Sequence, residues 1–150
     1  MILPDFKAFP RVGRVLGVDW GARRIGVAVS SPDRQFIFVR DVISIARGAR
    51  NRAQLVTDMA MTENVVGIVV GLPLYPDGTE SDTTKMVQEF ATELSSKTHL
   101  PICFIEENLT SHVAQEGMGR VRVRDLKERL DSESARVILE NAIAMINRAE

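Results

Sequence analysis

Three short runs of β-forming residues lie so close together near the start of the chain that few arrangements can connect them. The runs are RVLGVDW (14–20), IGVAVSS (25–31) and FIFVRDVI (36–43), and four residues separate each run from the next. A parallel connection needs a dozen or more residues, whereas short connectors containing Gly21 or Pro32 are typical of tight turns. We therefore expect an antiparallel meander.

The pattern after the meander alternates between helical and strand-like segments. Apolar residues at helical spacing predict helices, and unbroken apolar runs predict buried central strands. The predicted helices are 51–63, 81–96, 110–116 and 132–147, and the predicted strands are 65–70 and 101–105. Right-handed crossovers would set strands four and five parallel to strand one. The fold class is therefore α/β, a five-stranded mixed sheet with antiparallel strands 1–3, flanked by helices.

Length and composition exclude several classes of protein. The 150 residues, 45% hydrophobic and 26% charged, fit a single globular domain at 14–150 behind an irregular N-terminal leader at 1–13. The lone Cys103 excludes an internal disulfide framework and a Cys-rich zinc site. The sequence has neither a run long enough to span a membrane nor a signal-peptide core, so we expect a cytoplasmic protein with no membrane partner.

Carboxylates follow the predicted strands at the edge of the sheet where sites form in open α/β folds. Asp19 closes the first strand, Glu106 and Glu107 close the last, and Asp131 opens the final helix. Such a hard-oxygen cluster suits Mg²⁺ or Mn²⁺, and two such ions can clamp a phosphodiester. Alternatively, Asp19 is a turn residue, the glutamates are solvated and Asp131 is a helix N-cap.

Arginine dominates the basic residues, accounting for 15 of 19, although the net charge is only −1. Arginine binds phosphate in two-pronged geometry, and the basic groups flank the carboxylates in sequence. The candidate nucleic-acid contacts are Arg23, Arg24, Arg120, Arg122, Arg124, Lys127 and Arg129. The alternative for the 120–129 segment, expected to be a mobile loop ahead of Asp131, is a solvated basic surface.

A turn-rich loop, 71–78, is expected beside the carboxylates. Gly71, Pro73 and Gly78 would shape it, and its backbone N–H groups could contact a substrate strand. Thr110 is expected chiefly to cap a helix, with a substrate contact as the second interpretation. Trp20 could stack on a base or pack against the sheet.

Four segments together resemble a known family. They are LGVDWGARRIGVAVS (16–30), VVGLPLYPDGTES (69–81), EENLTS (106–111) and DSESARVIL (131–139). In order and spacing they resemble the signature blocks of the YqgF/RuvX family, whose members have an RNase H-like fold, are similar to Holliday-junction resolvases and are assigned as pre-16S rRNA nucleases. The resemblance implies that Asp19, Glu107 and Asp131 form a metal-binding catalytic set.

The resemblance implies a hydrolase that processes the 5′ end of precursor rRNA in ribosome biogenesis, as a monomer or a homodimer. Two alternatives stay open: a resolvase-like nuclease that cuts branched DNA, and a poorly catalytic RNA-binding assembly factor. The chain departs from the family pattern at Asn108, where Arg is usual. Losing that basic group could weaken phosphate binding. An actin-like ATPase would need a second such domain, for which the 150 residues leave little room.

Overall fold

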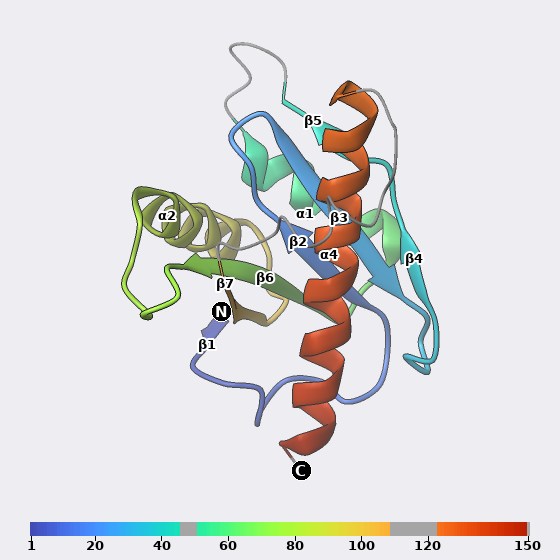
Figure 1. The fold of residues 1–150 in the computed structure, drawn as a ribbon. Coiled ribbons are helices and arrows are strands. Elements are labelled where there is room, and N and C mark those ends of the chain that lie inside the picture. Colours follow the sequence, from blue (N-terminus) through green and yellow to red (C-terminus); the bar gives the residue numbers. More distant parts are fainter. Residues whose placement is uncertain (46–50, 109–122, 150) are drawn as a thin grey trace.

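The computed structural model describes residues 1–45, 51–108 and 123–149 (Figure 1); for residue 108 and residues 123–132 it describes the backbone alone. The helices are α1 (Arg52–Glu63), α2 (Asp82–Lys97) and α4 (Val123–Arg148). The strands are β1 (Ile2–Leu3), β2 (Val15–Asp19), β3 (Arg24–Ser30), β4 (Ile37–Val39), β5 (Ile43–Ser44), β6 (Gly67–Leu74) and β7 (Ile102–Asn108).

One mixed sheet organises the molecule, with the strand order β1-β7-β6-β2-β3-β4 and β5 paired to β3. β3 is antiparallel to β2 and β4, whereas β6 and β7 run parallel to β2. The predicted α/β fold class, its meander and its parallel crossovers are therefore confirmed. All the parallel strands end at one edge of the sheet, as a candidate site at that edge requires.

Helices cover both faces of the sheet (Figure 1). On one face, α4 packs its apolar stripe on alternate strand residues such as Val15, Val69 and Ile105. On the other face, α1 and α2 cover the intervening residues, such as Leu16 and Val70. The sheet is therefore buried on both faces, which is why its central strands read as unbroken apolar runs.

The strand boundaries differ from the prediction in three places. The third predicted strand, 36–43, divides into β4 and β5, which both pair with β3. The fourth continues to Leu74, so Gly71 and Pro73 belong to β6 rather than to a loop. The first 13 residues, expected to be irregular, include β1, which adds a parallel strand beside β7, and the buried Phe6 and Phe9.

The last helix also begins earlier than predicted. It spans 26 residues from Val123, so Asp131 lies within α4 and neither opens nor caps it. The basic residues Arg124, Lys127 and Arg129, expected on a mobile loop, lie on the same helix. No glycine or proline interrupts the chain between residues 120 and 148, so nothing in this stretch breaks a helix. The predicted helix at 110–116 lies outside the described residues.

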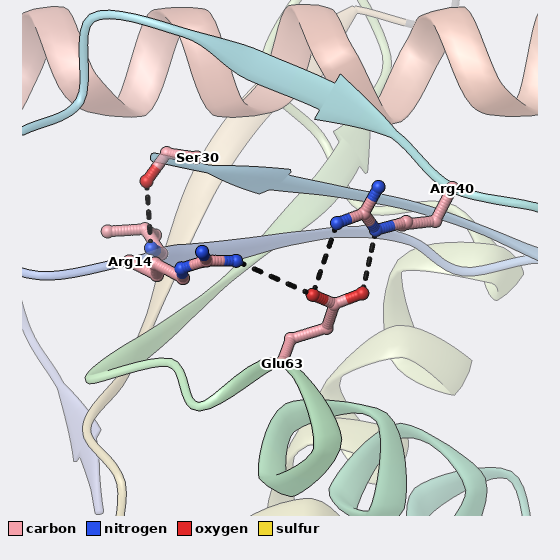
Figure 2. Close-up of polar contacts among 5 residues, drawn as sticks. Arg14, Ser30, Arg40 and Glu63 are labelled. Atoms are coloured by element: carbon pink, nitrogen blue, oxygen red, sulfur yellow. Dashed lines mark hydrogen bonds and ion pairs between the residues drawn. The ribbon is translucent and has the colours of Figure 1, made fainter. Parts of the chain in front are cut away.

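Polar contacts hold α1 to the meander at the opposite end of the sheet. Figure 2 shows Glu63, at the end of α1, between Arg40 and Arg14. Arg40 donates two hydrogen bonds to the Glu63 carboxylate, at 2.7 and 3.3 Å, and Arg14 lies 3.8 Å away. The buried Ser30 hydroxyl accepts a hydrogen bond from the backbone N–H of Val15.

None of the helices in the described parts of the chain has the length and apolar character of a membrane span.

Candidate active site

Asp19 is the last residue of β2 and lies at the edge where the parallel strands end. It pairs with Gly26 on β3, and its side chain is partly buried. Two residues earlier, a Cβ added to Gly17 would lie 3.0 Å from Leu139 Cβ and 3.1 Å from the Ala135 carbonyl oxygen. Because strand side chains alternate between faces, Asp19 shares the α4 face with Gly17.

Glu107 extends from the same face of the sheet, on β7. The alternation places it with Cys103 and Ile105, which pack beneath α4. Glu106 points to the opposite face and is exposed, whereas Glu107 is partly buried. The sequence alone left both glutamates as candidates, and only Glu107 shares a face with Asp19.

Gly71 leaves the space into which the Glu107 carboxylate extends. A Cβ added to Gly71 would lie 2.9 Å from Glu107 Oε1 and 2.5 Å from Ile138 Cδ1. The carboxylate and the Ile138 side chain of α4 therefore fill the volume that a larger residue would need. No sequence signal marked this contact, because it joins residues 67 positions apart through a helix–sheet interface.

The register brings Gly71 level with Asp19. β2 and β6 pair in parallel through Val18 and Val70, and the next residues along the two strands are Asp19 and Gly71. Neighbouring strands lie about 5 Å apart. The Glu107 carboxylate, folded back over Gly71, therefore lies about one strand spacing from the position of Asp19.

Burial changes the acidity of this group. Desolvation raises the pKa of the Glu107 carboxyl from 4.5 to about 7, because removing water from a carboxylate disfavours its charged form. A divalent cation beside the carboxylate would oppose that shift by favouring the ionised form. A largely buried carboxylate on the same face of the sheet as Asp19 has the oxygen atoms that Mg²⁺ and Mn²⁺ prefer as ligands.

The third member of the predicted set is only partly described. The backbone of Asp131 lies one helical turn before Ala135, where α4 crosses Gly17. Its side chain is outside the described residues. Among the residues whose side chains the structure describes, no three His, Cys, Asp or Glu form a metal-binding group. The described part of the site therefore consists of Asp19 and Glu107.

The predicted phosphate contacts fall in different places. Arg23 is exposed in the turn after β2, and Arg24 begins β3, paired with Ser44. Arg120, Arg122 and Thr110 lie outside the described residues. For Arg124, Lys127 and Arg129 on α4, the structure describes only the backbone. For all of these residues, nucleic-acid contact stays a prediction.

The end of β6 leads into a tight turn rather than a long loop. The N–H of Tyr75 donates to the Thr79 carbonyl, and Gly78 adopts a left-handed φ of 86°. Behind the turn, the Thr84 hydroxyl donates to the carbonyl of Pro73 and accepts a hydrogen bond from the N–H of Ser81 at 2.9 Å. This capping box ties α2 to β6. Pro73 pairs with Glu107 across β6 and β7, whereas Gly78 is exposed at the turn, and substrate contact by either residue stays a prediction.

The comparison with protein families accords with this geometry. A family model described as "RuvX: Holliday junction resolvase" matches residues 13–145. The chain belongs to this family. It is accordingly a nuclease, a member of the hydrolases.

Two curated relatives carry the name "Putative pre-16S rRNA nuclease". The protein from Maridesulfovibrio salexigens is 35% identical over 133 residues, which cover 87% of this chain and 98% of the relative. The protein from Rhodopirellula baltica is 36% identical over 135 residues, which cover 89% of this chain and 78% of the relative. The similarity therefore extends over most of this RuvX-family chain.

A solved structure shares the fold. RuvC from T. thermophilus, in complex with a Holliday junction substrate, matches with a TM-score of 0.56 at 12% sequence identity. The match covers 91% of this chain and 97% of RuvC. The architecture of the RuvX-family chain is thus RNase H-like.

Proposed function

We propose that this protein is a metal-dependent endonuclease that processes the 5′ end of pre-16S rRNA in the cytoplasm during ribosome biogenesis. One observation carries the proposal. The Glu107 carboxylate occupies the space over Gly71, on the same face of the sheet as Asp19 and beneath the helix that carries Asp131. The names of the curated relatives support the choice of precursor rRNA.

In this mechanism Asp19, Glu107 and Asp131 hold Mg²⁺ or Mn²⁺. When bound, the cation supplies Lewis-acid stabilisation of charge on the phosphodiester and lowers the pKa of a water molecule. Glu107 must be ionised to bind the cation, so its raised pKa lets protons compete with the metal, and binding should strengthen as the pH rises toward 7. Burial beneath α4 keeps competing water away from this carboxylate.

The basic residues position the substrate backbone. Arg23, Arg24, Arg120, Arg122, Arg124, Lys127 and Arg129 would bind phosphates and release counterions. Such contacts fix register without reading sequence. Neutralising them should weaken binding across substrates and flatten its salt dependence.

Cleavage of two substrates tests the proposal. A 5′-extended 16S precursor fragment and a four-way DNA junction are each incubated with wild type, Asp19→Asn and Glu107→Gln, in Mg²⁺, Mn²⁺ or EDTA. Glu106→Gln is the matched control, because its side chain is exposed on the opposite face of the sheet. Folding of each variant is checked by circular dichroism.

We expect metal-dependent cleavage of the RNA by wild type and by the control variant. Asp19→Asn and Glu107→Gln should lose about 10²-fold or more in rate, since each loses a carboxylate that would hold the cation, and the cation would stabilise the charge that develops on the phosphodiester. If the protein cleaves only the junction, its substrate is branched DNA rather than precursor rRNA, in line with the family's description. Binding without cleavage of either substrate would leave the assembly-factor alternative.

A further inference from the structure

The first residue of α1 reaches across to the turn that directly follows Asp19. The guanidinium carbon of Arg52 lies 5.6 Å from the centre of the Trp20 ring, and Arg52 Nη2 donates a hydrogen bond to the Ala22 carbonyl oxygen at 2.5 Å. Arg52 thus bridges both sides of the turn at residues 20–23. The sequence places Arg52 in a cluster of basic residues at 47–52 but does not indicate its contact with the turn.

The same turn is restrained from other directions. A Cβ added to Gly21 would overlap the Arg24 carbonyl oxygen, so the chain closes as tightly as glycine permits. On the far side, the N–H of Ile45 donates to the Arg23 carbonyl at 2.9 Å. The segment after Asp19 is therefore held between α1 and the chain that follows β5.

The contact is a poor device for stability alone. Trp20 Nε1 and Arg52 Nε are buried and make no hydrogen bond in the described structure. Burying a donor without a partner is destabilising, which offsets much of the cation–π attraction. Ala22 is exposed, so water could satisfy its carbonyl without Arg52. The remaining effect of the Arg52 contact is to fix the turn in one position.

We propose that Arg52 is a positioning residue for Asp19, which sets the placement of that carboxylate toward the metal by holding the Trp20–Arg23 turn. The inference rests on the proposed metal site. Asp19 ends β2 and pairs with Gly26 on β3, and the chain then passes directly into this turn, so the position of the turn bears on the backbone of Asp19. Loss of a residue that orients a metal ligand typically costs 10–100-fold in metal affinity.

The sole tryptophan of the chain supplies a direct readout, because Trp20 is the neighbour of Asp19. Tb³⁺, a hard cation that replaces Mg²⁺ in oxygen sites, would be titrated with excitation of Trp20 and detection of sensitised emission. The test variant is Arg52→Met, which keeps an apolar side chain over the ring and removes both the donor to Ala22 and the unsatisfied Nε. Gln54→Met, also on α1 but hydrogen-bonded to Asp58 of the same helix, is the matched control.

We expect Arg52→Met to weaken the apparent Kd for Tb³⁺ and Mn²⁺ by 10-fold or more, with no fall in Tm. On the RNA substrate, its kcat should fall while KM stays near that of wild type. Arg52→Lys, which restores a cation over Trp20, should recover part of the affinity. The control variant should match wild type in every measurement.

Two results separate the inference from the proposed function. If wild type and Asp19→Asn give the same Tb³⁺ response, the metal site at Asp19 is wrong, and the inference falls with it. If Asp19→Asn abolishes the response but Arg52→Met retains the wild-type Kd, the metal site stands and the role of Arg52 is refuted. A lower Tm with unchanged Kd would make Arg52 purely structural, which also refutes the inference.

Discussion

Replacing Glu107 by glutamine should stabilise the metal-free protein, by an amount that grows as the pH rises from about 4.5 to about 7. The carboxyl has a pKa of about 7 in the folded protein, against 4.5 for its ordinary value. The folded state therefore binds the proton more tightly than the unfolded state. Its contribution to stability is complete below about pH 4.5 and is lost as the pH rises through 7. Glutamine, always neutral, avoids this loss.

The size of the effect follows from the two pKa values. Each unit of difference corresponds to about 1.4 kcal/mol, so the wild type should lose about 3 kcal/mol, relative to Glu107→Gln, between pH 4.5 and pH 8. For a domain of this size, 1 kcal/mol shifts Tm by about 2–4 °C. The variant should therefore melt about 6–12 °C above wild type at pH 8 and at nearly the same temperature at pH 4.5.

The assay is thermal unfolding in EDTA, followed by circular dichroism across this pH range. The quantity compared is the difference in Tm between variant and wild type, because other titrating groups are common to both proteins. Glu106→Gln, whose side chain is exposed on the opposite side of β7, should show no such pH-dependent difference. Adding Mg²⁺ at pH 8 should raise the Tm of wild type but not that of Glu107→Gln, since a ligand that binds only the folded state stabilises it.

A difference in Tm that stays constant with pH would refute this reasoning. It would mean that the Glu107 carboxylate is solvated in the folded protein. A variant that becomes less stable than wild type as the pH rises would mean that the carboxylate already has a cationic partner. Either result would remove the desolvated carboxylate on which the metal site depends.

Two further substitutions test the packing. Gly71→Ala should cost about 1–3 kcal/mol in unfolding free energy, because the new Cβ would lie 2.5 Å from Ile138 Cδ1. Ile138→Val removes that atom, so the double variant should recover part of the loss when unfolded in urea. Losses that simply add in the double variant would contradict the contact. Glu63→Gln should cost about 1 kcal/mol by weakening its pairs with Arg40 and Arg14; the cost should shrink in high salt, and a salt-independent loss would contradict the ionic origin.

The strand order could be predicted from the sequence because short connectors and apolar runs restrict topology, but the end of β6 could not. Pro73 indicated a loop, since proline lacks the N–H that a central strand needs. Beyond Val70, however, β6 has β7 as its continuing partner, because β2 ends at Asp19. A proline is tolerated there as it would be at a sheet edge.

The start of α4 was missed for a similar reason. Asp131 has the residue type of an N-cap, so the sequence alone predicts a helix that begins there. The preceding residues include Leu126, Lys127 and Glu128, which are good helix formers, and α4 runs through them. β1 was not predictable locally, because two residues form a strand only by pairing with β7, about a hundred positions away.

Part of the site was accessible from sequence. Asp19 could be located because it ends an apolar run, and the family resemblance selected Glu107 over Glu106. The reason for that selection appears only in three dimensions, where alternation on β7 turns Glu107 toward α4. The partners that shape the site, Gly71 and Ile138, meet through tertiary packing that no local pattern encodes.

The contact of Ile138 with Gly71 has a consequence for when the site can exist during synthesis. Asp19 lies on one of the first strands to leave the ribosome, whereas the wall over the Glu107 carboxylate arrives with α4, more than a hundred residues later. Folding during synthesis proceeds from the N-terminus. A nascent chain that has already formed the meander therefore lacks the helix that shields Glu107, and we expect nuclease activity to appear only after α4 docks.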